Sequence, residues 1–185
     1  MPKIIFTRKR AILATGKPGR IRIDWQSWKK FDRSTISGDT ALNPGFREFI
    51  QSLNADNVRY LIVDGYAVAL HGYPRYTKDL DIWIELSAEN ASNIIKALEH
   101  FGFTSLGLVQ TDFLVPDQII QLGYPPSRID MITTLPGVNF SVCYPDRITE
   151  IIEGVPINFI DLDNLKKNKK ASGRYQDLAD LENLN

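Results

Sequence analysis

Residues 61–85 are LIVDGYAVALHGYPRYTKDLDIWIE, and the second apolar strand in this stretch carries two aspartates, Asp79 and Asp81. In a strand, residues i and i+2 project from the same face, about 6.5 Å apart along the chain. Carboxylate oxygens are the ligands that hard cations such as Mg²⁺ prefer. The spacing therefore lets both side chains converge on one cation.

The surroundings of this pair favour a metal site. An Asp-x-Asp pair by itself is more typical of a solvated strand edge. Here the neighbours are apolar, and a buried charge without a partner is costly. Two carboxylates that face the same way also repel each other unless a cation or a proton lies between them. The apolar residues are Leu80, Ile82, Trp83 and Ile84.

A glycine turn lies just upstream of the pair, at Asp64, Gly65 and Tyr66. It follows a strand expected over residues 60–63 and opens a short helix expected over residues 66–71. Backbone N–H groups at such a turn can bind a phosphate. A phosphate-binding turn beside metal-binding carboxylates indicates nucleotide chemistry.

A third carboxylate is expected on a neighbouring strand. Residues 117–134, DQIIQLGYPPSRIDMITT, predict an alternating strand, a Pro-Pro turn and a second strand that holds Asp130 between Ile129 and Met131. Its alternative role is a salt bridge with Arg128. Beside the first pair, we interpret Asp130 as a further metal carboxylate.

These motifs, in this order, resemble the nucleotidyltransferase superfamily that includes DNA polymerase β. Within it, residues 60–84 and RIDMITTLPGV at 128–138 are similar to a family of small bacterial nucleotidyltransferase-like proteins. That family is related to abortive-infection toxins and to minimal nucleotidyltransferase antitoxins. The stretch IDLDNLKKNKKASGRYQDLADLENL at 160–184 also resembles its closing helices. The resemblance spans about residues 44–184.

The resemblance implies an α/β (α+β) nucleotidyltransferase fold, with a mixed, mainly antiparallel sheet flanked by helices. It implies transfer of a nucleoside monophosphate from an NTP to an acceptor hydroxyl, with release of pyrophosphate. Asp79 and Asp81 would hold two Mg²⁺ ions (or Mn²⁺), and Asp130 would help to position and deprotonate the acceptor. The acceptor class would be an RNA end, a protein or a small molecule.

The expected nucleotide-binding residues come from three segments. Arg75 can reach a phosphate or form a salt bridge with Asp79 or Glu85, and Thr77 can support the first carboxylate. Lys169 lies in a basic run that ordinarily marks solvated helix surface, but the family resemblance makes it a phosphate contact. The full set is Asp64, Gly65, Tyr66, Arg75, Thr77 and Lys169. Asp177 and Asp180, on one helix face, are expected to pair with basic neighbours.

Asp64 departs from the family pattern, which usually has glycine at this position. Glycine permits close approach of a phosphate, whereas a carboxylate repels one. Three outcomes follow: Asp64 turns away, it joins the metal cluster, or nucleotide binding is impaired. The last outcome would make the chain a catalytically impaired binding module.

The first 43 residues form a basic arm and linker, and residues 44–185 form the predicted nucleotidyltransferase-like domain. Residues 1–33 hold ten Lys or Arg and two acidic residues, although the whole chain has a formal net charge of zero. Basic residues interleaved with aromatics can bind nucleic acid. The alternative is an arm or hairpin that packs on the body or on a second subunit.

Composition sets the remaining expectations. One cysteine, Cys143, excludes a disulfide framework, and no apolar run approaches the ~20 residues that span a bilayer. We expect a cytoplasmic protein without membrane association. The expected partners are an NTP, an RNA or protein acceptor, and a toxin or antitoxin. The oligomeric state is not indicated.

The capping pattern predicts the other elements. Helices are expected over residues 45–53, from the N-cap Ser87 to about His100, from the N-cap Asp161 to about 171, and from there to 184. Strands are expected over 119–122 and 128–133. A hairpin is expected over 147–160, with its turn at Glu153 and Gly154.

Overall fold

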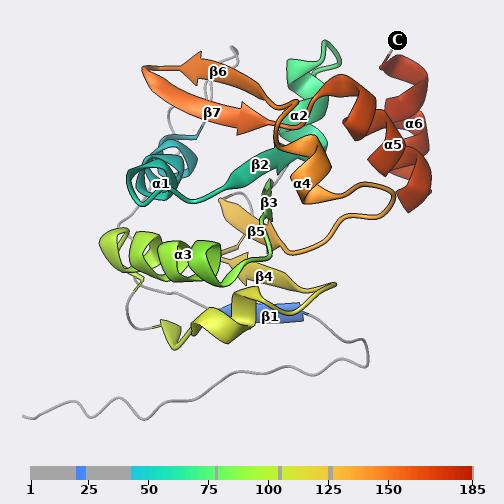
Figure 1. Cartoon of the computed structure of the whole chain (residues 1–185). Helices are drawn as coiled ribbons and strands as arrows, with labels where there is room; N and C mark the ends of the chain where they lie inside the picture. The colour runs from blue at the N-terminus through green and yellow to red at the C-terminus, as the bar shows by residue number, and fades with distance from the viewer. Residues whose placement is uncertain (1–19, 24–42, 78, 104–105, 125–126, 185) are drawn as a thin grey trace, which may run out of the picture.

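The computed structural model describes residues 20–23, 43–77, 79–103, 106–124 and 127–184. Within them the chain forms a seven-stranded mixed sheet of order β1-β4-β5-β3-β2-β7-β6, with helices packed against it (Figure 1). The strands are β1 (Arg20–Ile23), β2 (Tyr60–Val63), β3 (Asp79–Ile84), β4 (Ile119–Leu122), β5 (Arg128–Ile132), β6 (Ile148–Ile152) and β7 (Val155–Phe159). The predicted α/β class and mixed sheet are confirmed, but the sheet is not mainly antiparallel: in the described residues three strand pairings are parallel and three are antiparallel.

Most helices lie between these strands along the chain, and the last two follow the final strand. They are α1 (Pro44–Ala55), α2 (Asp64–Leu70), α3 (Ala88–His100), the 3₁₀ helix η2 (Gln110–Phe113), α4 (Phe140–Cys143), α5 (Leu162–Ser172) and α6 (Tyr175–Asn183). Figure 1 shows α5 and α6 together at one end of the molecule, beside α2. None of the helices in the described segments is long and apolar enough to cross a membrane.

Parallel and antiparallel pairings alternate across the sheet. β3 lies in the middle, parallel to β5 and antiparallel to β2. β4 is antiparallel to β5 and β7 is parallel to β2, while β6 and β7 form a hairpin. This order places the two aspartate-bearing strands, β3 and β5, side by side at the centre of the sheet.

Side-chain caps fix the helix starts near the predicted positions. Asn43 Oδ1 accepts a hydrogen bond from the Gly45 backbone N–H at 2.9 Å, and the Ser87 hydroxyl accepts one from Asn90 at 3.1 Å. Asp161 accepts one from Asn164 at 3.0 Å. Each bond satisfies an N–H group that a helix start leaves unpaired. Ser87 and Asp161 are therefore N-caps, as their sequence positions predict.

The β6–β7 hairpin forms where the sequence places it. Glu153 and Gly154 both have positive φ, at 48° and 80°. Two successive positive φ values are typical of the type I′ turn, whose twist suits a two-residue hairpin loop.

The core lies between the sheet and the pair α1 and α3, which contact each other. Fully buried side chains come from α1, the central strands and α3; the largest include Phe49, Ile50, Leu53, Tyr60, Leu61, Ile62, Leu80, Ile82, Trp83 and Ile84. The apolar part of β3 thus anchors the strand in the core, while its N-terminal half carries the aspartates.

Two short helices lie outside the sequence predictions, and one strand agrees with the alternative in which part of the arm packs on the body. The strand is β1, which falls within the predicted arm, and its backbone adds a strand parallel to β4 at one edge of the sheet. The two short helices are η2 and α4. The remaining basic and aromatic residues of the arm lie outside the described residues.

Candidate functional site

Strands β3 and β5 bring the three predicted metal carboxylates onto neighbouring positions. Asp81 and Asp130 are directly paired in the parallel register, and Asp79 is paired with Arg128. Because Asp79 and Asp81 are two residues apart in one strand, their side chains share a face of the sheet. The sheet therefore assembles the Asp79, Asp81 and Asp130 group, which we call the carboxylate site.

The ionised form of Asp81 is the most strongly disfavoured of the three carboxylates at this site. Burial raises the pKa of its carboxyl well above the ordinary value, and the charges of Asp64, Asp79 and Asp130 raise it further. Within the described part of the chain, no side chain donates a hydrogen bond to Asp81 or forms an ion pair with it. A proton or a cation at this position would relieve the repulsion.

Asp130 is held by donors from β4 and β5. Gln121 Nε2 lies 3.1 and 2.9 Å from the two carboxylate oxygens, and Arg128 Nε lies 2.8 Å from Oδ1. Burial is the main cause that raises the pKa of Asp130, and the donated hydrogen bonds oppose it. Gln121 has no distinctive sequence signal; its position opposite Asp130 comes from the antiparallel β4–β5 register.

Asp79 also has partners. Thr77 Oγ1 donates to Asp79 Oδ1 at 3.0 Å, and Arg128 Nη2 donates to Asp79 Oδ2. The support of Asp79 by Thr77 is therefore present. The Arg128 guanidinium bridges Asp79 and Asp130, so the predicted salt-bridge alternative for Asp130 coexists with its place in the carboxylate site.

The carboxylate site suits a divalent cation in charge. Among the described residues it has three carboxylates and one guanidinium, so two negative charges remain when all four groups are ionised. The ligands are all hard oxygens, the type that Mg²⁺ and Mn²⁺ prefer. In the described part of the chain, however, the three carboxylates do not place one oxygen each within 4.8 Å of one another, so they do not converge on a single point as they stand. The Arg128 guanidinium lies between two of the carboxylates, and a cation that binds all three must displace it.

The turn after β2 approaches this site closely. A Cβ added at Gly65 would lie 2.7 Å from Thr77 Cβ. Gly65 therefore has to be glycine for Thr77 to remain beside Asp79. Tyr66 packs its ring edge-on against Phe46 at a centroid distance of 6.1 Å, and burial raises the pKa of its hydroxyl to about 12.

Asp64 is the first residue of α2 and has φ of 51°, in the left-handed region. Its carboxylate contacts three cations: Arg75 Nη2 at 2.7 Å, Lys169 Nζ at 2.9 Å and Arg174 Nη2 at 3.2 Å. Of the three outcomes that the sequence left open, Asp64 turns to basic side chains of other segments. The short helix begins at Asp64, two residues before the predicted start.

Lys169 lies at the centre of this group. Its Nζ lies 2.9 Å from Asp177 Oδ1 and 2.7 Å from Asp180 Oδ2, in addition to the contact with Asp64. Arg75 also pairs with Asp180, and Arg174 pairs with Asp177. We call these six residues the Asp64 cluster. Asp177 and Asp180 thus pair with basic neighbours, as predicted.

One oxygen each of Asp64, Asp177 and Asp180 lie within 4.8 Å of one another, a spacing that can suit a metal ion. The Lys169 ammonium already occupies that space. Burial lowers the pKa of Lys169, but the three carboxylates outweigh this effect and raise it. Lys169 therefore stays protonated, and the acidic group is a set of ion pairs.

The predicted nucleotide-binding residues fall into two adjacent groups. Gly65 and Thr77 adjoin the carboxylate site, together with Tyr66. Asp64, Arg75 and Lys169 belong to the Asp64 cluster. The predicted alternative partners of Arg75 are wrong, because it pairs with Asp64 and Asp180. The sequence did not indicate Gln121, and it indicated Arg174 only as part of the basic run on the closing helices.

No family model and no curated protein matches the chain. Two solved structures are similar to it. An antigenic nucleotidyltransferase-like protein from Paracoccidioides brasiliensis has 20% identity and a TM-score of 0.45, covering 75% of this chain and 71% of its own. A candidate nucleotidyltransferase from Thermotoga maritima has 13% identity and a TM-score of 0.47, covering 75% and 88%. At these identities and TM-scores, only the side chains of this chain bear on its function.

Proposed function

We propose that the protein is a divalent-metal-dependent nucleotidyltransferase, which transfers a nucleoside monophosphate from an NTP to an acceptor hydroxyl. The observation that carries this proposal is the environment of the Asp81 carboxylate. This partly buried carboxylate shares a strand face with Asp79 and is paired in register with Asp130. Desolvation and the neighbouring carboxylates raise its pKa, the charge of Arg128 lowers it in part, and no Lys or Arg among the described residues forms an ion pair with it. Carboxyl groups with strongly shifted pKa values are common at enzyme sites that bind a cation or move a proton.

The residues would divide the work as follows. Asp79 and Asp81 would hold Mg²⁺ or Mn²⁺, and the bound cation would supply charge stabilisation for the transfer. Thr77 fixes the orientation of Asp79, and Gln121 fixes that of Asp130. Asp130 would accept the acceptor's hydroxyl proton. The new O–P bond forms as the bond to the pyrophosphate leaving group breaks.

The test is transfer of label by the native chain. Incubation with α-³²P-labelled NTPs and Mg²⁺ or Mn²⁺ should label an RNA, protein or small-molecule acceptor in a cell extract, and EDTA should abolish the labelling. The matched control is γ-³²P-labelled NTP, whose label should appear in pyrophosphate. Transfer of the γ label would indicate a kinase, and no transfer from any NTP would contradict the proposal.

The position of Arg128 leads to a prediction about metal affinity. Replacing its guanidinium in Arg128→Gln removes a competing cation, so we expect Mn²⁺ to bind roughly tenfold more tightly, about 1.4 kcal/mol. Titration of the full chain by calorimetry measures this. Arg59→Gln is the control, because Arg59 pairs with Glu85, 2.7 Å away, and does not touch the carboxylate site. Unchanged or weaker Mn²⁺ binding by Arg128→Gln would contradict the arrangement.

A second candidate function is a catalytically impaired binding module, and Asp64 favours it. Three cations that can bind phosphate are engaged by this carboxylate. A toxin or antitoxin partner, and nucleic-acid binding by the basic arm, remain predictions from the sequence, as does a cytoplasmic location.

A further inference from the structure

The Asp64 cluster has the composition of an anion site that the protein fills with its own carboxylate. Arg75 follows α2, Lys169 comes from α5, and Arg174 precedes α6. These three separate segments place their cations within 3.2 Å of one side chain. Convergence of guanidinium and ammonium groups on one point is how proteins bind phosphate.

The backbone at Asp64 is consistent with such a special position. A φ of 51° is unfavourable for most residues and free of strain for glycine. The ion pairs hold the aspartate in this conformation. In this conformation the carboxylate pairs with Lys169 of α5 and with Arg174, which precedes α6, while its charge still raises the pKa of Asp81 in the carboxylate site.

The charges of the cluster balance only while Asp64 is present. Asp177 and Asp180 retain their pairs with the three cations. Without Asp64, three positive charges would face two negative charges. The site would then carry one net positive charge, next to a space that the Asp64 side chain had filled.

Solvent can reach this place. The Asp64 side chain is 24% exposed and that of Arg174 is 65% exposed, whereas Lys169 is 1% exposed. An anion can therefore approach past Arg174 toward the buried ammonium. The cluster also adjoins the carboxylate site, because Val63, the residue before Asp64, is paired with Asp81.

We propose that Asp64 acts as a built-in competitor for a polyphosphate site formed by Arg75, Lys169 and Arg174. A polyphosphate, free or as part of a nucleoside triphosphate, binds there by displacing the Asp64 carboxylate from the three cations. The inference rests on the proposed function only for naming the triphosphate as the natural ligand. It makes Asp64 the element that weakens nucleotide binding in the native chain.

The test measures binding of inorganic tripolyphosphate to the full chain in EDTA at fixed ionic strength. Asp64→Gly keeps the left-handed backbone without strain and removes the carboxylate. We expect it to bind tripolyphosphate at least roughly tenfold more tightly than the native chain. Asp64→Asn keeps the size of the side chain and removes its charge, so a smaller gain in the same direction is expected. Equal affinity in the native chain and both variants would overturn the proposal.

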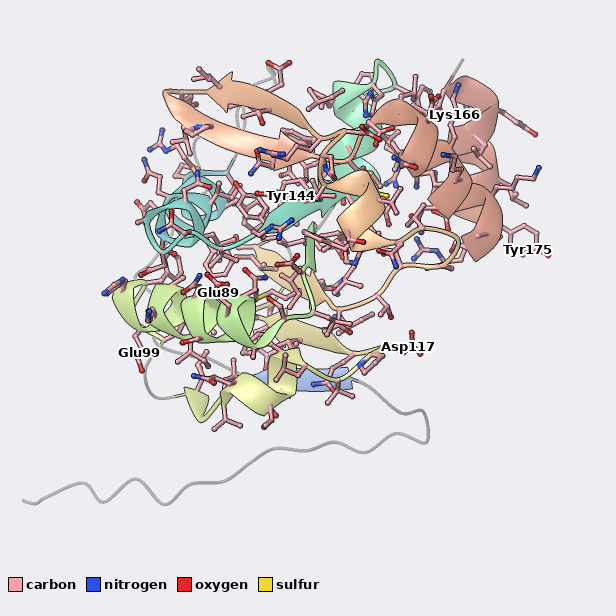
Figure 2. All side chains as sticks on the ribbon, in the orientation of Figure 1. Glu89, Glu99, Asp117, Tyr144, Lys166 and Tyr175 are labelled. Atoms are coloured by element: carbon pink, nitrogen blue, oxygen red, sulfur yellow. The ribbon has the colours of Figure 1, made fainter. Side chains whose placement is uncertain are left out.

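Asp117→Gly is the matched control. Asp117 is another aspartate with positive φ, 56°, but it bonds to Thr134 and lies away from α5 and α6 in Figure 2. Its substitution should leave tripolyphosphate affinity unchanged. Adding Arg174→Ala to Asp64→Gly should remove most of the gain. A gain that Asp117→Gly reproduces, or that survives Arg174→Ala intact, would place the anion elsewhere and overturn the proposal.

ATP without metal separates the two sources of polyphosphate. If Asp64→Gly raises the affinity for ATP about as much as the affinity for tripolyphosphate, the inference is supported. If it raises the affinity for ATP alone, the adenine base causes the gain, and the inference is overturned. The measurement involves no metal and no transfer. Tighter binding by Asp64→Gly without any labelled acceptor would therefore sustain this inference and count against the proposed function.

Discussion

Replacing Lys169 by methionine should lower the free energy of unfolding by about 3–5 kcal/mol, the range for removing one partner of a buried ion pair. Lys169 is 1% exposed, and Asp177 and Asp180 are 1% and 0% exposed. Methionine fills a similar volume without the charge. The two buried carboxylates and Asp64 would then face only two cations, Arg75 and Arg174. Water reaches Asp64 but hardly reaches Asp177 and Asp180, so most of the excess negative charge stays poorly solvated.

Urea denaturation of the two proteins at neutral pH measures this loss. Lys170→Met is the matched control, since Lys170 is the adjacent residue of α5 and is exposed. Its effect should stay within about 0.5 kcal/mol, as for most surface substitutions. A loss below about 1 kcal/mol for Lys169→Met would show that the cluster does not bind α5 to α2 and α6 as the contacts indicate.

The difference in free energy of unfolding between the native chain and Lys169→Met should also depend on pH. Burial tends to raise the pKa of Asp177, but hydrogen bonds from Arg174 and Lys169 outweigh it and lower the pKa to about 2. A lowered folded-state pKa stabilises the protein above the ordinary aspartate value of about 3.9, and this stabilisation is lost as the pH falls toward 2. The gap between native and Lys169→Met should therefore be widest above about pH 5 and narrow below pH 4.

Local sequence signals predict much of this fold. Caps at Ser87 and Asp161, and the turn at Glu153 and Gly154, depend on residues within three or four positions of each other. The shared face of Asp79 and Asp81 follows from the period of a strand. These features need no knowledge of distant contacts, so they can be read from one sequence.

The partners of the site residues depend on register and on tertiary packing. Gln121 faces Asp130 because β4 and β5 pair at that offset. Arg75 pairs with Asp180, 105 residues away, while the sequence offered only the nearby Asp79 and Glu85 as alternatives. A charged side chain has several oppositely charged groups close to it in the sequence. Which partner it binds in the folded protein depends here on how α6 docks.

The position of α5 and α6 also changes the interpretation of the basic run. Lys169 belongs to a segment that by composition is a solvated surface, yet it is buried at the centre of three carboxylates. Its burial follows from Asp177 and Asp180, which face the same side of α6. The acidic pair predicted from helix spacing and the buried lysine are thus parts of one structure.

Asp81→Asn should abolish metal-dependent transfer and, at the same time, stabilise the metal-free protein. Removing one group that stabilises transition-state charge typically costs about 10²–10³ in rate, and Asp81 would also be a direct metal ligand. Its carboxylate is destabilised by burial and by the charges of Asp64, Asp79 and Asp130. Asparagine removes that repulsion, so the free energy of unfolding should rise by roughly 0.5–2 kcal/mol, as when other unfavourable groups at functional sites are replaced.

The pH dependence gives the sign of this stabilisation. Because the folded-state pKa of Asp81 is raised, the native chain loses stability as the pH increases from the ordinary aspartate value through the raised one. The variant lacks this loss, so its advantage should appear above about pH 4 and persist at neutral pH. Asp146→Asn, at an exposed position, is the control and should change neither transfer nor stability.

Mn²⁺ provides the decisive comparison between a metal site and a merely strained carboxylate. Added Mn²⁺ should raise the melting temperature of the native chain, since a ligand that binds only the folded state stabilises it by mass action. It should leave Asp81→Asn nearly unchanged. If Asp81→Asn is more stable but Mn²⁺ stabilises both proteins equally, Asp81 holds no metal. The repulsion between Asp81 and the neighbouring carboxylates would then be unrelated to metal binding. If the variant is less stable than the native chain in EDTA, Asp81 makes a favourable contact, and the electrostatic basis of the proposed function is wrong.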